Sequence, residues 1–229
     1  MSQPSTLREQ FEQHCIIIDC GLRVVETTIK NLAAIVAADG TQSYNPYHVI
    51  YSRRKSYESV ERKAKRKRLP KTIESYKKFT DIGGIRIVTL FIDDVYRILD
   101  DIKKQPNLVV VDVQDWIANP KENGYRSLHV LVQVIVYCNG AARTVTIEIQ
   151  IRTIFMEPLW EIEHLINYEL PTDDPAIIAS FRHRANELYQ FELKLVEMRD
   201  RAFAKSAEAG AEFVESIKTQ APSQKPSTN

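Results

Sequence analysis

Hydrophobic and polar residues alternate strictly along residues 144–153, and this run is the clearest pattern in the chain. The apolar positions are Val145, Ile147, Ile149 and Ile151, and the polar positions between them are Thr146, Glu148, Gln150 and Arg152. Because successive side chains of a β-strand point to opposite faces, the pattern predicts a strand with one buried face and one polar face. A carboxylate, an amide and a guanidinium on one rigid strand suit a phosphate or metal site. An ordinary amphipathic strand with a solvated outer face is the alternative.

Apolar runs and turn residues predict four further strands, at residues 48–53, 85–90, 108–113 and 127–137. Asn139-Gly140 separates the last of these from the alternating strand, which we take as residues 143–152. This dipeptide favours a tight β-hairpin, because both of its residues tolerate the backbone conformation that such a turn requires. Residues 119–124, Asn-Pro-Lys-Glu-Asn-Gly, are predicted to form a loop.

Helical patterns surround and separate these strands. The predicted helices cover residues 5–38, 56–68, 72–79, 93–104, 157–168 and 174–218. Ser5 and Ser56 are the expected N-caps of the first two helices, and Asp93 or Asp94 is expected to cap the fourth. Pro70 is expected to stop the second helix.

The order of these elements predicts one α+β domain with a mixed β-sheet, flanked by N- and C-terminal helices. We divide the chain into a helical segment at residues 1–45, a core at 46–170, C-terminal helices at 171–218 and a tail at 219–229. The tail is polar and is expected to be disordered. No internal repeat interrupts this arrangement.

The composition is that of a soluble globular protein, with 44% apolar and 27% charged residues among 229. The N-terminal residues lack the apolar stretch of a secretory signal, and no run approaches the roughly 18 apolar residues of a membrane span. We therefore expect a cytoplasmic protein with no membrane association. Cys15, Cys20 and Cys138 have no paired metal-binding spacing, so they are interpreted as small core residues.

The net charge of +1 conceals a strongly basic segment. Residues 53–71 contain ten Lys or Arg against only Glu58 and Glu61, a local charge of +8, which leaves −7 on the rest of the chain. Such a segment indicates a polyanionic partner, although a solvated charged helix is the usual alternative. The pairs Glu58 with Arg62 and Glu61 with Lys65 have the i,i+4 spacing that supports a helix.

Part of this basic segment is arranged to hold phosphate groups through side chains. The chain has only seven glycines and neither of the common glycine-rich phosphate loops. Instead, Ser59, Lys63 and Arg66 fall at i, i+4 and i+7 on one helical face. Arg53 and Lys55 lie on the extended segment just before it. Cations that converge in this way can bind one phosphate chain, whereas the alternative is a solvated or nucleic-acid-binding helix.

Two carboxylates are candidates for metal-assisted chemistry. Asp81 lies at the entrance of the strand predicted to end at Leu90, beside Gly83 and Gly84, and Glu148 lies on the polar face of the alternating strand. They form the only pair of acids in which both members adjoin predicted core strands. Magnesium binds through one or two carboxylates together with substrate phosphates, so the pair suits Mg²⁺. For Asp81 alone, a turn or capping role is the alternative.

A third candidate segment, residues 123–129, reads Asn-Gly-Tyr-Arg-Ser-Leu-His. Tyr125 presents a ring that can stack on a nucleobase, and Arg126 and His129 can contact phosphate or sugar. By itself this signal is weak, because a tyrosine at the start of a strand more often packs against the core.

Four motifs together make the chain resemble the RelA/SpoT-type alarmone synthetases, particularly the small single-domain members. The motifs are Arg-Arg-Lys-Ser-Tyr-Glu-Ser at 53–59, Asp-Ile-Gly-Gly-Ile-Arg at 81–86, residues 123–129, and Glu-Ile-Gln-Ile-Arg-Thr at 148–153. The resemblance covers residues 48 to about 170 and implies a nucleotidyltransferase-like synthetase core. No His-Asp hydrolase motif precedes it, which implies synthesis without a hydrolase domain.

The resemblance implies a GTP diphosphokinase that moves the β,γ-pyrophosphate of ATP to the ribose 3′-hydroxyl of GDP or GTP and releases AMP. It implies ATP contacts by Arg53, Lys55, Ser59, Lys63 and Arg66. Asp81 and Glu148 would be the catalytic residues and Mg²⁺ ligands, with Glu148 also the candidate base. The acceptor nucleotide would contact Tyr125, Arg126, His129, Gln150 and Arg152. A homo-oligomer that forms through the terminal helices is also implied.

Two departures from the family pattern bear on the acceptor. Gly83 stands where we expect alanine, and the segment 156–164 carries Pro158 and a displaced Trp160. That segment helps to form the acceptor pocket in the family, so the 3′ end of tRNA or an adenosine nucleotide is the alternative acceptor. The unused cations of the basic segment suit an RNA backbone. A non-enzymatic RNA- or nucleotide-binding module is a third hypothesis, but it leaves the two carboxylates unexplained.

Overall fold

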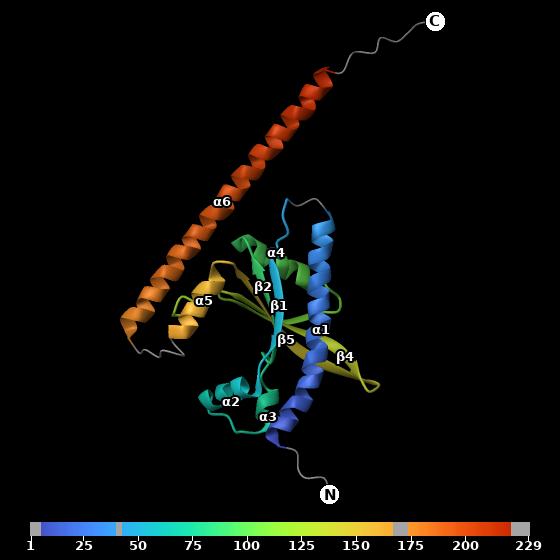
Figure 1. Ribbon diagram of the computed structural model, residues 1–229, viewed down its shortest axis with the longest axis vertical. Helices are drawn as coiled ribbons and strands as arrows, with labels where there is room; N and C mark the ends of the chain where they lie inside the picture. Colours follow the sequence, from blue (N-terminus) through green and yellow to red (C-terminus); the bar gives the residue numbers. More distant parts are fainter. Residues whose placement is uncertain (1–5, 40–42, 167–173, 221–229) are drawn as a thin grey trace.

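The computed structural model describes residues 6–39, 43–166 and 174–220 (Figure 1). Its centre is a five-stranded mixed sheet with strand order β1-β2-β5-β4-β3. The strands are β1 (Val49–Arg54), β2 (Gly83–Thr89), β3 (Val109–Asp115), β4 (Leu128–Cys138) and β5 (Ala141–Thr153). β2 and β5 run parallel, whereas the other three neighbouring pairs are antiparallel. The predicted α+β fold with a mixed sheet is confirmed.

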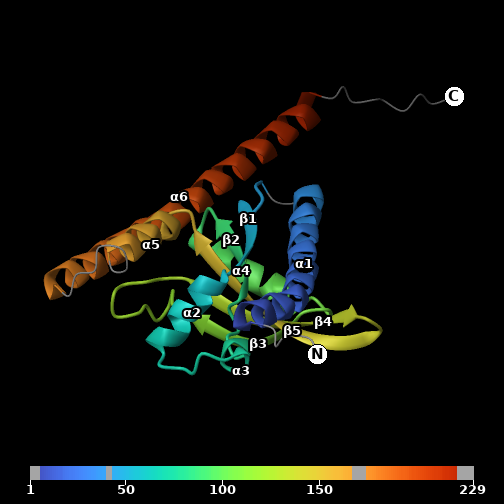
Figure 2. The same cartoon turned by 60° about the horizontal axis from the view of Figure 1, so that its bottom comes forward.

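Six helices accompany the sheet within the described residues. They are α1 (Leu7–Asp39), α2 (Tyr57–Arg66), α3 (Ile73–Lys77), α4 (Ile92–Lys103), α5 (Met156–His164) and α6 (Pro175–Gln220). In both views α1 lies on one side of the sheet, whereas α2 and α5 lie on the other (Figure 2). The expected cap Ser5, the last two residues of the predicted helix at 157–168, and residues 221–229 of the tail lie outside the described residues.

α1 covers the apolar face of the sheet with one regular stripe. Its buried side chains recur every three or four residues, which places them on one face of a helix: Phe11, Cys15, Ile18, Leu22, Val25 and Ile29. Gly21 lies in this stripe, and a Cβ there would come within 2.6 Å of a methyl carbon of Val145. The absence of a side chain therefore lets α1 lie close against β5. Cys15 is buried here as expected, while Cys20 and Cys138 are half-buried against the same core.

Local capping follows the sequence in α2 and departs from it in α1 and α4. The Oγ of Ser56 accepts a 3.3 Å hydrogen bond from the backbone N–H of Ser59, as predicted. In α1 the cap is Thr6, which exchanges two hydrogen bonds with Glu9 in a capping box. The expected cap of α4 was wrong, because Phe91 occupies the N-cap position without a side-chain hydrogen bond.

The acids of α2 pair with cations outside the helix. Glu58 pairs with Arg8 of α1, and Glu61 pairs with Lys71, so the predicted i,i+4 partners are not the ones used. α2 ends at Arg66, two residues before the predicted end, and Arg68 adopts a left-handed backbone with φ of 54°. The basic helix thus begins where the sequence indicates but is held by tertiary contacts.

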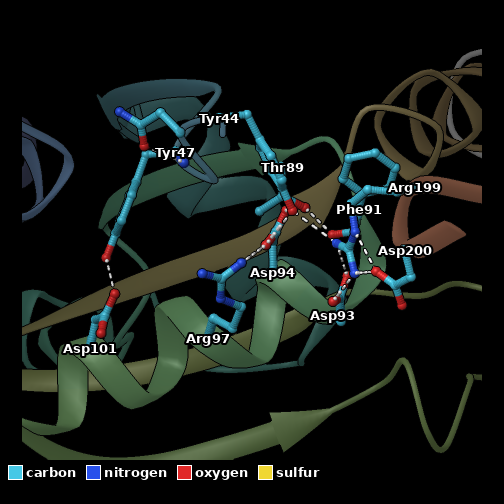
Figure 3. Close-up of polar contacts among 11 residues, drawn as sticks. Tyr44, Tyr47, Thr89, Phe91, Asp93, Asp94, Arg97, Asp101, Arg199 and Asp200 are labelled. Atoms are coloured by element: carbon cyan, nitrogen blue, oxygen red, sulfur yellow. Dashed lines mark hydrogen bonds and ion pairs between the residues drawn. The ribbon is translucent and has the colours of Figure 1, made fainter. Parts of the chain in front are cut away.

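The two aspartates at the start of α4 anchor other elements (Figure 3). Asp94 is buried and accepts a 2.9 Å hydrogen bond from the Tyr44 hydroxyl. Asp93 forms a two-pronged ion pair with Arg199 of α6, at 2.9 and 2.7 Å. The guanidinium of Arg199 also lies 4.7 Å from the ring centroid of Phe91. These contacts fix α6 against the domain, and the helix then continues well beyond it (Figure 1).

The hairpin between β4 and β5 forms as predicted. Asn139 and Gly140 both have positive φ, of 52° and 75°, which is the pattern of a type I′ turn. The pairing that this turn sets brings His129 opposite Gln150 and Leu131 opposite Glu148. Among the described residues no helix combines the length and the apolar character that a membrane span requires.

Candidate active site

β5 places its apolar side chains in the core and its polar side chains toward a cleft. Val145, Ile147, Ile149 and Ile151 are buried, as the alternation predicts. Glu148 and Gln150 are half-buried on the other face, and Arg152 is only 1% exposed. The polar face is therefore not an ordinary solvated surface.

Asp81 and Glu148 come together because β2 and β5 are parallel neighbours. Gly84 lies directly beside Glu148 in the register, and Asp81 precedes β2 by two residues. Both carboxylates line one small hollow, together with Arg53 and Lys55. The negative charge of Asp81 acts on Glu148 and opposes a low pKa there. The two acids thus face the same side of the sheet.

Two lysines hold Asp81. The ammonium groups of Lys55 and Lys63 both pair with its Oδ2. Burial acts to raise the pKa of Asp81, but the two lysines outweigh burial and lower it. Its second oxygen, Oδ1, is buried and has no hydrogen-bond partner among the described residues. Asp81 is therefore an ionised carboxylate with one oxygen free to accept a ligand.

Glu148 is held by two hydrogen-bonding neighbours. His129 Nδ1 lies 3.1 Å from its Oε1, and Gln150 Nε2 donates to its Oε2 at 2.7 Å. Burial acts to raise the pKa of Glu148, but His129 and Gln150 outweigh burial and lower it. The carboxylate is consequently ionised at neutral pH and has a fixed orientation.

A large cleft contains nearly all of the predicted site. One wall is cationic and comes from β1 and α2, while the other comes from β4, β5 and α5. The predicted residues that line it are Arg53, Lys55, Ser59, Lys63, Arg66, Asp81, Tyr125, His129, Glu148, Gln150 and Arg152. The structure therefore gathers segments that are up to about a hundred residues apart in the chain.

Arg126 is the one predicted site residue that the structure places elsewhere. Its guanidinium lies 4.1 Å from the ring centroid of Tyr189 and donates to Asn186 Oδ1 at 3.0 Å, both on α6. It also donates to the backbone carbonyl of Ile117. Tyr125, the residue before it, lines the cleft, whereas Arg126 points away from the cleft and connects the loop to α6.

Tyr125 is packed rather than open. Its ring is 7% exposed, with Trp160 edge-on at 4.6 Å between centroids and Lys121 Nζ 4.7 Å from its centroid. Its hydroxyl lies 2.7 Å from His129 Nε2 and accepts from Arg152 Nη2 at 2.8 Å. A nucleobase that stacks on Tyr125 has to displace one of the groups beside its ring.

Sequence reasoning missed three residues that contribute to this region: Arg86, Lys121 and Glu157. Lys121 and Arg86 had a detectable signal, because each is a cation within or beside one of the four motifs. Glu157 had none, since its importance comes from partners on three different strands.

The donor set fits a magnesium ion. Among the described residues, no cluster of three or more His, Cys, Asp or Glu side chains is arranged to hold a metal. Two carboxylates on one side of a hollow, one of them with a buried oxygen that lacks a hydrogen bond, match an ion that takes most of its ligands from phosphates and water.

Comparison with known proteins finds a matching family model and several similar proteins. A sequence model described as a region found in RelA and SpoT proteins matches residues 52–173. The chain is 32% identical over 194 residues to GTP pyrophosphokinase YwaC of Bacillus subtilis, which covers 83% of this chain and 90% of the relative. It is 33% identical over 179 residues to GTP pyrophosphokinase YjbM of the same organism, which covers 78% and 83%.

Solved structures show the same likeness. The chain resembles small alarmone synthetase 1 of Bacillus subtilis bound to its product pppGpp, with a TM-score of 0.76 and 26% identity. The match covers 84% of this chain and 97% of that one. The same synthetase bound to AMPCPP matches with a TM-score of 0.70 and 25% identity, over 85% and 98% of the two chains.

Proposed function

The chain belongs to the RelA/SpoT family and is a GTP pyrophosphokinase that makes (p)ppGpp, and we propose how its cleft performs this reaction. The β,γ-pyrophosphate of ATP passes to the ribose 3′-hydroxyl of GDP or GTP, and AMP leaves. The observation that carries the proposal is that Asp81 and Glu148 line one hollow, beside Arg53 and Lys55.

The cationic wall is the proposed ATP site. Arg53, Lys55, Ser59, Lys63 and Arg66 all line the cleft and come from β1, α2 and the short connection between them. Ammonium and guanidinium groups neutralise the phosphate chain, and they stabilise the charge that builds up on the leaving AMP. Most of the acceleration in phosphoryl-type transfer comes from such positioning and charge stabilisation.

Asp81 and Glu148 are the proposed ligands of Mg²⁺. The buried Oδ1 of Asp81, which lacks a hydrogen bond, supports this role. When bound, the ion neutralises charge on the phosphates of the transferred group and orients them. Lys55 and Lys63 hold Asp81 in place through its other oxygen.

Glu148 is the proposed general base. Its low pKa keeps it ionised at neutral pH, so it can accept the proton of the 3′-hydroxyl. The new bond joins the 3′-oxygen to the β-phosphorus, and the bond that breaks joins that phosphorus to the oxygen bridging it to the α-phosphate. His129 and Gln150 keep the carboxylate pointed toward the cleft.

The acceptor side is proposed to consist of Tyr125, His129, Gln150 and Arg152, which line the wall opposite the cations. Arg126 is left out of this set, because its partners are Tyr189 and Asn186 on α6. The guanine nucleotide is the favoured acceptor, because the two Bacillus subtilis relatives described above are named GTP pyrophosphokinases. The experiment below also tests the 3′ end of tRNA and adenosine nucleotides as alternative acceptors.

The test incubates the protein and Mg²⁺ with γ-labelled ATP and, in separate reactions, GDP, GTP, unlabelled ATP or deacylated tRNA. Label on a guanosine 3′-pyrophosphate, with AMP in equal amount, is the expected result. Asp81→Asn and Glu148→Gln are each expected to lower kcat by at least about a hundredfold. Asp100→Asn, on the exposed side of α4, is the control and retains full activity. Transfer of label to tRNA alone refutes the guanine acceptor.

We also propose that the protein works in the cytoplasm as a homo-oligomer formed through α1 and α6. Large apolar side chains on these helices lie exposed in the single chain: Ile16 and Ile35 on α1, and Met198 and Phe203 on α6. Sedimentation equilibrium tests the assembly, and a monomer at micromolar concentration contradicts it.

A further inference from the structure

Glu157 bridges two arginines that approach it from different strands. Its Oε1 accepts from the Arg86 guanidinium of β2 and from the Tyr51 hydroxyl of β1. Its Oε2 accepts from Arg152 Nη1 of β5 at 3.1 Å. Arg86 also donates to the Tyr51 hydroxyl at 2.8 Å, so Tyr51, Arg86 and Glu157 are all hydrogen-bonded to one another.

The two arginines lie beside residues of the two proposed substrate sites. Arg86 lines the small hollow with Arg53 and Lys55 of the proposed ATP site, and this hollow extends to Gln150 of the proposed acceptor side. Arg152 donates to Tyr125 Oη and to Gln150 Oε1, each at 2.8 Å, on the proposed acceptor side. One carboxylate from α5 therefore holds an arginine beside each proposed site.

Burial makes this bridge energetically important. The side chains of Arg152, Arg86 and Glu157 are 1%, 10% and 17% exposed. A buried guanidinium that loses its counter-charge is destabilised far more than an exposed one, so it seeks another anion. For Arg152 the competing anion is Glu148, because Gln150 hydrogen-bonds to both of these side chains.

We propose that Glu157 is a positioning residue that sets Arg86 and Arg152 at once, so that binding of the ATP donor and of the guanine acceptor both depend on this one carboxylate. The assignment of the two substrate sites rests on the function proposed above. Glu157 itself touches neither substrate nor reacting atoms in this proposal. It acts through the two arginines and the residues that they hold.

The test compares Glu157→Gln with Glu161→Gln, an equal change of charge at an exposed position on the same helix. Direct binding of a non-hydrolysable ATP analogue and of GDP is measured, together with KM and kcat for transfer. Glu157→Gln is expected to raise Kd for both nucleotides about tenfold or more, which corresponds to about 1.4 kcal/mol for each. Glu161→Gln is expected to match the wild type, and Glu157→Asp is expected to recover part of the loss.

Tyr51→Phe separates the two sites, because it removes only the contacts on the Arg86 side. It is expected to weaken binding of the ATP analogue several-fold and to leave GDP binding unchanged. If Glu157→Gln does not fold, as judged by thermal unfolding, Tyr51→Phe still tests the dependence of ATP binding on this group, and Glu157→Asp tests the dependence of both nucleotides.

An unchanged Kd for either nucleotide in folded Glu157→Gln overturns the proposal, and so does a Tyr51→Phe protein with normal ATP binding. A wild-type protein that shows no pyrophosphate transfer refutes the proposed function instead. The two failures are therefore distinguishable.

Discussion

His129 Nδ1 lies 3.1 Å from Oε1 of Glu148, and this contact helps to keep a largely buried carboxylate charged. Without a donor, burial raises the pKa of a carboxyl group because it penalises the ionised form. His129 and Gln150 reverse that effect at Glu148. The histidine is thus tied to the charge state of the proposed base, in addition to any contact that it makes with substrate.

Replacing His129 should shift the pH dependence of the reaction. In His129→Gln a neutral amide replaces the charge interaction with His129 that lowers the pKa of Glu148, while burial remains, so the pKa rises. Glu148 then becomes protonated at a higher pH. The acidic limb of the plot of kcat/KM against pH is therefore expected to move to higher pH. His183→Gln, on the exposed surface of α6, is the control. An acidic limb that stays in place in the active variant contradicts this role.

Lys63 is expected to limit metal binding in the absence of nucleotide. Its ammonium group and that of Lys55 both contact Asp81 Oδ2, so they repel a divalent cation. Lys63→Gln should increase Mn²⁺ affinity of the nucleotide-free protein by roughly fivefold, since removing one nearby charge is worth about 1 kcal/mol. The same variant should bind ATP more weakly. Titration followed by electron paramagnetic resonance measures the first effect.

Lys65→Gln is the matched control for this prediction, because Lys65 lies exposed on the same helix. It should leave Mn²⁺ affinity unchanged. Equal or weaker Mn²⁺ binding in Lys63→Gln is the result that contradicts competition between the lysine and the metal.

Gly83 should not tolerate the alanine that the family motif leads one to expect. A Cβ at this position would lie 2.8 Å from Ile18 Cγ2 of α1 and 2.9 Å from Ile147 Cδ1 of β5. Gly83→Ala is therefore expected to lower the free energy of unfolding by about 1–3 kcal/mol. Gly84→Ala is the control, because its nearest neighbour would be at an ordinary 3.8 Å. Urea unfolding that shows equal stability for both variants contradicts the expected clash.

Glu192 makes stability depend on pH. Burial raises its pKa to about 7, and its Oε1 has no hydrogen-bond partner among the described residues. The folded protein then binds this proton more tightly than the unfolded chain does. The stabilisation that comes from this tighter proton binding is fully present below the pKa of Glu192 in the unfolded chain, near 4.5. It is lost as the pH rises through about 7.

Glu192→Gln mimics the protonated form and tests this linkage. Relative to the wild type, it should be equally stable at pH 4 and more stable at pH 8, by about 1–3 kcal/mol. Glu197→Gln, at an exposed position of α6, should show no such pH-dependent difference. A constant difference between Glu192→Gln and the wild type across this range counts against a raised pKa.

Local sequence determined most of the secondary structure and much of the candidate site. The alternation in β5, the Asn139-Gly140 turn and the Ser56 cap all depend on a few neighbouring residues, and each formed as predicted. The spacing of Ser59, Lys63 and Arg66 likewise fixes them on one face of α2, and all three line the cleft. These features could be predicted because helical and strand geometry dictates which side chains share a face.

Only the tertiary structure decided which faces meet. The parallel pairing of β2 with β5 brings Asp81 next to Glu148, and no local pattern encodes that pairing. Packing against α6 turned Arg126 away from the cleft, and α5 placed Glu157 between Arg86 and Arg152. The physical reason is that side-chain direction is set by short-range backbone geometry. The choice of partners between distant segments instead depends on how the whole chain buries its apolar faces and compensates its buried charges.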